Sequence, residues 1–378
     1  MLKKIKQIFE LVTLIIGTII GAGFISGAEL LHFFPTNGYF YYLIFAGILF
    51  IVSFSLLYTC GRKYDGFLGV LQTVFKKSGM IVHICMLLSS IILCGSMLAG
   101  FVSSLQLFFG VQRFLPLYSL LLLIVVFLIA FKGVKAVLQL NAVLVPFMVI
   151  LVLCFYKLPT TWQSVQMPTF SVVLNIILFV AFNLFLAAPV VCDLGAKHKQ
   201  EELKRQGQEG MIEQKKIAIF QERNLSIFLA TAIIILTAST ILENIIRCNG
   251  AMEQTLPFLY TIQGKIARSL FAISAIGGIL TTLFSAYYTL HSSVNTIKYA
   301  LFYRLLFAIC AYLLSIMGLK YIIKFCYPVI GSIGILFLTI LAIHLYMQRK
   351  ASNRKSSNRD NSYKNKERSA CENTIKPL

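Results

Sequence analysis

The chain has 378 residues, of which 58% are hydrophobic and only 13% are charged, and its mean hydropathy is +0.81. A single water-soluble core of this length cannot bury so much apolar surface, so the composition excludes an ordinary soluble globular protein. Nine cysteines are scattered along the chain, mostly inside apolar segments. They form neither a CxxC pair nor a His/Cys cluster with metal-ligand spacing, so most are expected to be small core residues.

Ten apolar stretches are long enough to cross a bilayer, which takes about 20 helical residues. They predict an all-α polytopic membrane protein with about ten transmembrane helices. The basic N-terminus before the first stretch also resembles a signal peptide, but no small-residue cleavage site follows it, so we interpret that stretch as the first helix. The expected spans are approximately 8–34, 39–60, 81–109, 117–131, 137–156, 171–194, 224–245, 264–290, 300–318 and 325–347.

The basic residues are distributed unevenly between the two sides of these spans. If the N-terminus is cytoplasmic, the inner segments hold 27 of the 34 Lys and Arg residues, which fits the positive-inside rule. The pattern predicts a multi-pass protein of the bacterial plasma membrane with both termini in the cytoplasm. Orientation and attraction to anionic inner-leaflet lipids account for the net charge of +20, so nucleic acid is not an expected partner.

Two segments interrupt the apolar pattern. Residues 195–223 are rich in Lys, Glu and Gln with interspersed apolar residues, so they are either a helix on the inner membrane surface or a solvated connector between two halves of the bundle. Residues 348–378 are rich in Asn, Ser, Lys and Arg and have few apolar residues. This composition predicts a disordered basic cytoplasmic tail after a transmembrane domain that spans 1–347.

The first span carries four glycines and a carboxylate in the run from Ile16 to Glu29. Such a run indicates a helix that opens towards a polar group, although small residues spaced by four also serve as packing faces. A second interruption is expected in span six, between Asn183 and Pro189. The half-helices beginning near Phe24 and Pro189 would then direct free N–H groups to the midplane, where an anionic group binds, while carbonyls near Ile20 and Asn183 would suit a cation.

Hydroxyl residues recur on one face of two further spans. Span three carries Ser89, Ser96 and Ser103 at intervals of seven residues. Span eight carries a second stripe, and its members are Ser274, Gly278, Thr281, Thr282 and Ser285. Each stripe alone is compatible with helix packing. Together with two interrupted helices they indicate a polar path through the bundle.

The run GTIIGAGFISGAE in span one, followed by His32-Phe33-Phe34, resembles the opening of the uncharacterised bacterial YkvI-type membrane proteins. That family belongs by similarity to the amino acid-polyamine-cation transporter superfamily. The resemblance implies a LeuT-type fold of two inverted five-helix repeats, here about 8–156 and 171–347, with helices one and six broken. It also implies a solute pocket between spans one, three, six and eight. The residues assigned to this pocket are Gly21, Ala22, Gly23, Phe24, Ser96, Phe182, Asn183 and Ala187.

The same resemblance implies a sodium site in which the hydroxyls of Thr281 and Thr282 join the carbonyls of Gly17 and Ile20. Proton-coupled relatives often place a lysine in span five, and residues 137–156 contain none, which favours sodium. A departure from the family pattern is the lack of glycine in the middle of span six.

Glu29 is an ionisable group inside a span, which marks it as functional by default. With His32 on the same face, it would carry a coupling proton or gate an outer vestibule. Alternatively, Glu29 lies close enough to the outer interface to be hydrated. Asp193, at the inner end of span six, is expected at the interface rather than buried.

The sequence therefore predicts a secondary transporter of a small organic solute, an amino acid or a related zwitterion or amine, coupled to Na⁺ or H⁺ and working by alternating access. The alternative is a membrane sensor or receptor subunit, similar to germinant-receptor subunits, that binds solute without flux. The chain contains no HExxH motif, no midplane carboxylate pair and no Ser-His-Asp arrangement in a recognisable context, so we do not expect an enzyme. No organic cofactor is expected.

Overall fold

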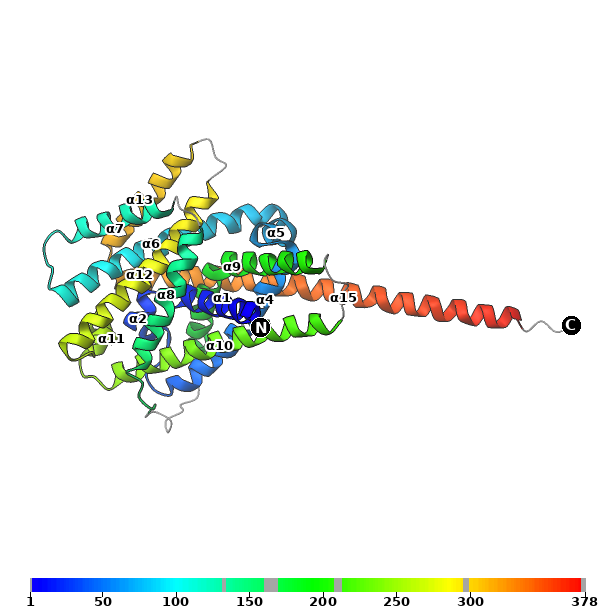
Figure 1. Ribbon diagram of the computed structural model, residues 1–378, viewed down its shortest axis with the longest axis horizontal. Coiled ribbons are helices and arrows are strands. Elements are labelled where there is room, and N and C mark those ends of the chain that lie inside the picture. The colour runs from blue at the N-terminus through cyan, green and yellow to red at the C-terminus, as the bar shows by residue number, and fades with distance from the viewer. Residues whose placement is uncertain (1, 131–133, 160–168, 207–212, 295–298, 375–378) are drawn as a thin grey trace.

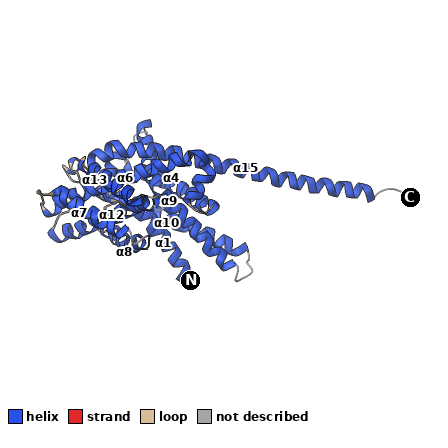
Figure 2. Cartoon of the chain, turned by 90° about the horizontal axis from the view of Figure 1, so that it is seen from above, coloured by secondary structure: helices blue, strands red, loops and turns tan. Residues whose placement is uncertain are grey.

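The computed structural model describes residues 2–130, 134–159, 169–206, 213–294 and 299–374. Every regular element in this part of the chain is helical (Figure 2). Six of the helices are long and apolar enough to cross a membrane, and four shorter apolar helices coincide with spans one, four, five and nine. The ten expected spans are thus confirmed as helices.

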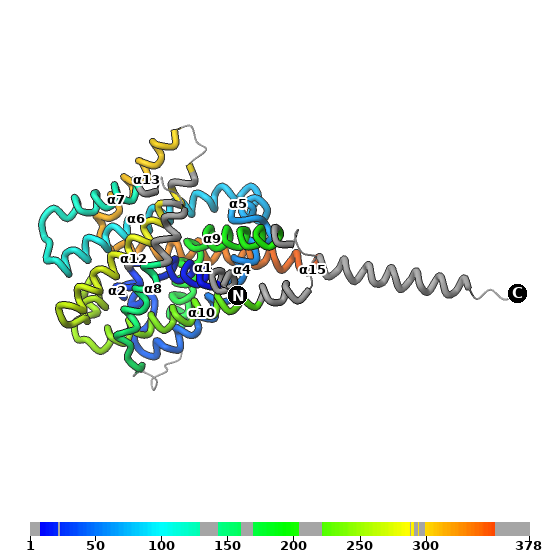
Figure 3. The backbone as a smooth tube through the Cα atoms, in the orientation of Figure 1, coloured from blue at the N-terminus to red at the C-terminus, as the bar shows by residue number. Residues whose placement is uncertain are grey.

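The elements that match the ten spans follow one another along the chain as traced in Figure 3. They are α1 (Leu2–Ile19) with α2 (Ala22–Ser26) and α3 (Ala28–Phe33), then α4 (Tyr39–Tyr64), α6 (Gly79–Phe109), α7 (Leu115–Ala130), α8 (Val134–Leu153), α9 (Phe170–Gln206), α10 (Glu213–Ile246), α12 (Lys265–Ser293), α13 (Ala300–Ile316) and α15 (Tyr327–Thr374).

Span one is broken, as its glycines predict. α1 ends at Ile19, and Gly21 is extended, with φ −102° and ψ −170°, before α2 begins at Ala22. A second bend follows at Gly27, whose φ of +81° lies in the left-handed region that favours glycine. The break and the bend divide span one into three short helices inside the bundle.

The predicted break in span six is wrong. α9 is one continuous helix that contains Pro189. Proline removes only one backbone donor, and neighbouring helices stabilise the remainder of the helix. The side-chain amide of Asn183 donates to the carbonyl of Phe179 at 2.9 Å, within its own helix. No half-helix therefore begins at Pro189, and Asn183 does not end one.

Most of each polar segment continues a span as a helix. Most of 195–223 belongs to the ends of α9 and α10, so it extends two spans rather than lying as a separate helix on the membrane surface; residues 207–212 are outside the described part. Helix α15 continues to Thr374 and projects away from the bundle (Figure 1), where the composition predicts disorder. Extending an existing helix avoids the cost of nucleation, which composition alone does not take into account. Residues 375–378 are outside the described part.

The spans pack as two groups. The first helix group is α1–α3, α4, α9 and α10, and the second helix group is α6, α7, α12 and α13, with extensive contacts within each. One core cluster is formed entirely by the second group, whereas a larger cluster is formed mainly by the first group with α8 and α15. Two separate cores make two bodies that meet along a seam.

Short helices occupy corresponding places in the two halves of the chain. The first set, α5 (Phe67–Val70), η1 (Leu71–Phe75) and η2 (Lys76–Ser78), connects spans two and three. The second set, η4 (Ala251–Glu253) and α11 (Pro257–Tyr260), connects spans seven and eight. A third set, α14 (Leu319–Tyr321) and η5 (Ile322–Cys326), precedes α15. Equivalent connections after the second helix of each half fit the expected five-plus-five repeat.

Residues assigned to the inner side gather at one end of the bundle. Arg62 on α4 binds Glu202 on α9 through two bonds of 2.6 and 2.7 Å. Lys199 pairs with Asp65 at 2.7 Å. The hydroxyl of Tyr64 donates to Gln348 on α15 at 2.8 Å. The ends of α4, α9 and α15 therefore lie on the same side, as the charge distribution predicts.

The opposite end holds a second polar cluster. Glu243 on α10 is fully buried, accepts a bond of 2.7 Å from the Tyr39 hydroxyl and pairs with Arg247 at 2.6 Å. Arg247 also donates to the carbonyl of Leu158 at 2.7 Å. This cluster fastens α4, α10 and the segment after α8 together.

Glycines let the backbones of α4 and α15 come close to that of α9. A Cβ atom on Gly61 of α4 would lie 2.1 Å from the carbonyl oxygen of Cys192 on α9. A Cβ atom on Gly334 of α15 would lie 2.3 Å from the carbonyl oxygen of Ala181 on the same helix α9. Such small-residue contacts are the usual means of tight packing in lipid.

We expect Gly61→Ala to separate α4 from α9 and to lower the free energy of unfolding by about 1–3 kcal/mol, the usual cost of overpacking. The measurement is the apparent Tm of the full chain in detergent, followed by size exclusion after heating. Gly277→Ala is the matched control, because its added Cβ would meet only the flexible end of Leu144 at 3.3 Å. Equal Tm values for the two variants would contradict the close approach.

Candidate functional site

The break in span one faces the hydroxyl stripe of span eight across the seam between the two helix groups. A Cβ atom built on Gly21 would lie 3.0 Å from Oγ1 of Thr282. Thr282 is 5% exposed, and its Oγ1 is buried without a hydrogen-bond partner among the described residues. A buried hydroxyl without a partner costs free energy, so this position is suited to an added ligand.

The backbone at the break leaves a carbonyl without its usual donor. In a regular helix the amide of Gly21 would bond to the carbonyl of Gly17. Here it bonds to the carbonyl of Ile19 at 2.9 Å, while the amide of Ile20 bonds to Ile16 at 2.8 Å. The Gly17 carbonyl thus loses its helical donor near the place where the sequence predicts a cation.

Thr281 differs from its neighbour. Its Oγ1 donates to the carbonyl of Gly278 at 3.0 Å, which uses the single proton and leaves the oxygen lone pairs. The predicted sodium ligands Thr282 and Gly17 therefore lie at or near the break. That Thr281 and Ile20 complete the ligand set stays a prediction.

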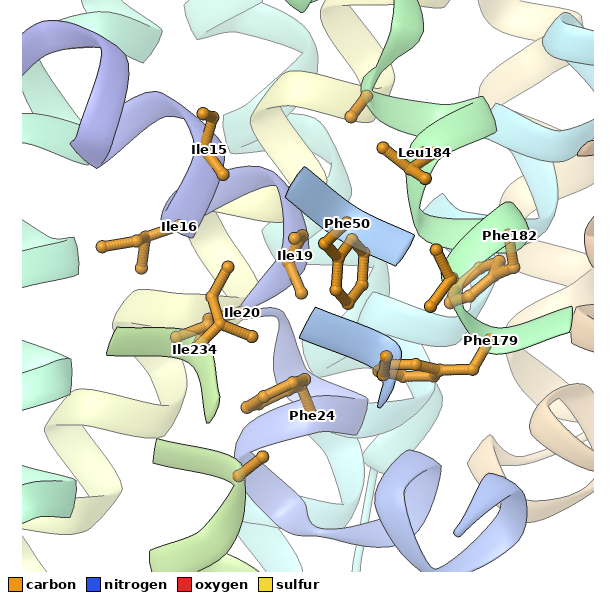
Figure 4. Close-up of a cluster of buried hydrophobic side chains, with 14 of the residues drawn as sticks. Ile15, Ile16, Ile19, Ile20, Phe24, Phe50, Phe179, Phe182, Leu184 and Ile234 are labelled. Atoms are coloured by element: carbon orange, nitrogen blue, oxygen red, sulfur yellow. The ribbon is translucent and has the colours of Figure 1, made fainter. Parts of the chain in front are cut away.

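The first turn of α2 presents backbone N–H groups that have no partner inside the helix. Gly23 and Phe24 belong to this turn, as does the backbone of Ala22, whose side chain is outside the described part. The Phe24 ring is fully buried, with its centroid 6.5 Å from that of Phe179 on α9. Figure 4 shows Phe24 beside Ile20, with Phe179 next to it and Phe182 on the side of the cluster away from the isoleucines.

Glu29 turns back onto Gly23. Its side chain is 3% exposed, and a Cβ atom on Gly23 would lie 2.0 Å from Oε1. Only glycine leaves room for the carboxyl here, which explains the third glycine of the run. Glu29 is therefore buried in the bundle, and the interpretation that it is hydrated at the outer interface is wrong.

Tyr327, at the start of α15, is the centre of the polar contacts. Its hydroxyl lies 2.7 Å from Oγ of Ser96 on α6. Its ring stacks on Phe182 of α9 with a centroid distance of 4.3 Å and an interplanar angle of 25°. The Glu29 carboxyl lies close enough to interact with the same hydroxyl. Tyr327 thus joins three residues that the sequence singles out separately.

Tyr327 could not be singled out from the sequence. The chain has 17 tyrosines, and no motif or periodicity distinguishes this one. The same holds for Phe179, whose ring meets those of Phe33, Phe34 and Phe50 at centroid distances of 5.6, 5.1 and 6.1 Å. Both residues acquire their positions from the packing of distant helices.

Other expected site residues serve packing within their own helices. Ser89 and Ser103 donate to carbonyls one turn back at 2.8 and 3.0 Å, so only Ser96 of that stripe makes a contact between helices. Ala187 is fully buried in α9. Asn183, as described above, bonds within α9. These two are part of the wall formed by α9, without a contact that places them at Tyr327 or Gly21.

Two flanking ionisable residues lie outside this polar centre. His32 is partly buried and meets the Phe33 ring edge-on at 4.8 Å. Asp193 is exposed and accepts a bond of 2.8 Å from the amide of Phe67, which caps α5. Its exposure agrees with the expectation that Asp193 is not buried, and its place at the membrane interface stays a prediction.

A separate groove lies between α7 and α13. Its lining includes Leu120, Phe127, Leu305 and Tyr312 and presents an apolar wall. It belongs to the second helix group, away from the break in span one. The polar contacts that suit a solute or a cation are therefore those at Gly21, Glu29 and Tyr327.

Comparison with known proteins supports this architecture. No protein-family model and no curated protein matches the chain. Among solved structures, it resembles Mhp1, a nucleobase-cation-symport-1 family transporter in a closed conformation with bromovinylhydantoin bound. The TM-score is 0.52 at 14% identity, covering 89% of this chain and 74% of that chain. The chain has a LeuT-like fold. At this identity the likeness establishes the fold, and the YkvI-type resemblance stays a prediction.

We expect Gly23→Ala to displace the Glu29 carboxyl and to lower the free energy of unfolding by about 1–3 kcal/mol through overpacking. The double variant Gly23→Ala with Glu29→Ala should recover most of that loss, because the added methyl then has room. Thermal unfolding of the four proteins in one detergent gives the coupling energy. Additive effects would show that Glu29 does not lie on Gly23 in solution.

Proposed function

We propose that the protein is a secondary active transporter of a small organic solute, coupled to a cation and working by alternating access. The observation that carries this proposal is the break in span one, where Gly21 faces the unpaired hydroxyl of Thr282 across the seam. Discontinuous helices of this kind form solute and ion sites near the midplane in many transporters.

The packing supports a movement at this seam. The second helix group has an apolar core of its own, and the larger core belongs mainly to the first group with α8 and α15, so the two groups can move against each other while most of each core stays packed. Rocking of one group against the other would open the site first to one side and then to the other. Ser96, Thr282, Gly21 and Tyr327 lie where the two groups meet, so a bound solute or cation would contact both.

We infer an amino acid, a related zwitterion or an amine as the solute. The N–H groups in the first turn of α2 suit a carboxylate, and the Glu29 carboxyl suits an ammonium group. The rings of Phe24 and Phe182 provide apolar walls nearby. Mhp1 has bromovinylhydantoin bound, so hydantoins belong in the set of test solutes.

Two cations fit different parts of the site. Sodium would bind the Thr281 and Thr282 hydroxyls with the carbonyls of Gly17 and Ile20, and the absence of lysine from 137–156 favours it. A proton would bind Glu29. We further propose a place in the bacterial plasma membrane with the charged end of the bundle in the cytoplasm, next to anionic lipids, and membership of the YkvI-type family.

The test is solute uptake by proteoliposomes that contain the full chain, with amino acids, the corresponding amines and hydantoins, under sodium and proton gradients imposed separately. Saturable uptake driven by one gradient is expected. Liposomes without protein are the control. Binding without flux under either gradient would contradict the transporter and favour the sensor or receptor subunit.

We expect Thr282→Val to raise the half-saturating sodium concentration for uptake about tenfold, which corresponds to about 1.4 kcal/mol, because valine has the same shape without the oxygen ligand. Ser285→Ala is the control on the same helix, since that hydroxyl already donates to the carbonyl of Thr281 at 2.9 Å. Identical sodium dependence in the two variants would remove Thr282 from the cation site.

A further inference from the structure

Three polar groups from three helices meet in the interior of the bundle. Glu29 lies on α3, Tyr327 on α15 and Ser96 on α6, and all three are buried. Oγ of Ser96 is 2.7 Å from the Tyr327 hydroxyl, and the Glu29 carboxyl is the other polar group that interacts with that hydroxyl. The three groups form a chain that connects the first helix group to the second.

The number of hydroxyl protons determines the direction of the hydrogen bonds among these three groups. Ser96 has one hydroxyl proton, and it donates that proton to the carbonyl of Leu93 at 2.8 Å. The contact of 2.7 Å with Tyr327 then requires Tyr327 to donate its own single proton to Ser96. Tyr327 has no further proton to offer, so its contact with Glu29 is a hydrogen bond only if Glu29 donates.

We propose that Glu29 carries a proton in this arrangement and that Tyr327 transmits its protonation to Ser96 on the second helix group. This inference rests on the proposed transport function and names the proton as a coupling ion with Glu29 as its site. Protonated Glu29 donates to Tyr327, Tyr327 donates to Ser96, and Ser96 donates to Leu93. Tyr327 and Ser96 are positioning residues in this relay.

When Glu29 releases its proton, the direction of donation in these hydrogen bonds is reversed. The Glu29 carboxylate then accepts the Tyr327 proton, and Tyr327 accepts the proton of Ser96. Ser96 must turn away from the carbonyl of Leu93, with no covalent bond changed other than the loss of one proton from Glu29. The contact across the seam therefore exists in two proton arrangements, and the state of Glu29 selects between them.

The charged groups around Glu29 favour a neutral, protonated carboxyl in this buried position. On α3 itself the other ionisable group is His32, on which the charge of Lys324 from η5 acts. On α10, Glu243 is bound to Tyr39 and Arg247. Within the described residues, no Lys, Arg or His forms an ion pair with Glu29. A buried carboxylate without a cation is costly, which favours the protonated acid here.

The experiment is infrared difference spectroscopy of the full chain in proteoliposomes, titrated with pH in sodium-free buffer and in D₂O. The probe is the proton alone, so the result does not depend on a known solute. We expect a carbonyl band of a protonated carboxylic acid that shifts in D₂O, vanishes at high pH and is absent in Glu29→Gln. Tyr327→Phe, which keeps the ring on Phe182, and Ser96→Ala should both shift the band.

Ser103→Ala is the control, since that hydroxyl donates within α6 at 3.0 Å and should leave the band unchanged. A band that persists in Glu29→Gln, or no band at any pH, would overturn the proton site. A band that Tyr327→Phe leaves in place, which tests the relay even if Glu29→Gln fails to fold, would overturn the role of Tyr327. Absence of uptake with the band present would refute the transporter while the proton site holds.

Discussion

The structure depends on the requirement that every backbone polar group inside a membrane finds a partner. A helix interrupted at Ile20 and Gly21 would be unstable against lipid, so it persists only where other helices cover it. The break in span one is therefore placed at the seam, where Thr282 of the second helix group faces it. The same requirement keeps α9 intact, since the side chain of Asn183 bonds to its own helix rather than opening it. The same requirement thus explains why other helices cover the break in span one and why α9 stays a regular helix.

Many polar side chains inside the bundle find their hydrogen-bond partner within one turn of their own helix. Ser89, Ser103 and Thr281 each donate to a nearby carbonyl and so add no polarity to the interior. Several buried residues depart from this pattern, and two of them lie at the candidate site. Thr282 has an unpaired hydroxyl, as does Ser274 on the same helix, and Ser96 makes a second contact with a distant tyrosine. Thr282 and Ser96 are thus distinguished from other buried hydroxyl residues by their hydrogen bonds and by their positions at the break and at Tyr327, rather than by residue type.

The spans and the break at Gly21 could be predicted from the sequence because they depend on local features, namely apolar length and glycine density. Thr282 and Ser96 could be placed on the inner faces of their helices by periodicity, and Glu29 could be singled out by its charge. Tyr327 could not, because its position depends on how α15 packs on α9. Span six was mispredicted for a related reason, since Pro189 breaks an isolated helix more readily than one held by its neighbours.

The glycine contact between α15 and α9 has a mechanical consequence. Gly334 brings the two backbones together, so a tilt of α9 would move α15 and Tyr327 at its start with it. Gln348, which accepts a bond from the Tyr64 hydroxyl, lies 21 residues after Tyr327 on the same helix, about 32 Å away at 1.5 Å per residue. A rotation of α15 at the seam would therefore be transmitted to the charged end of the bundle.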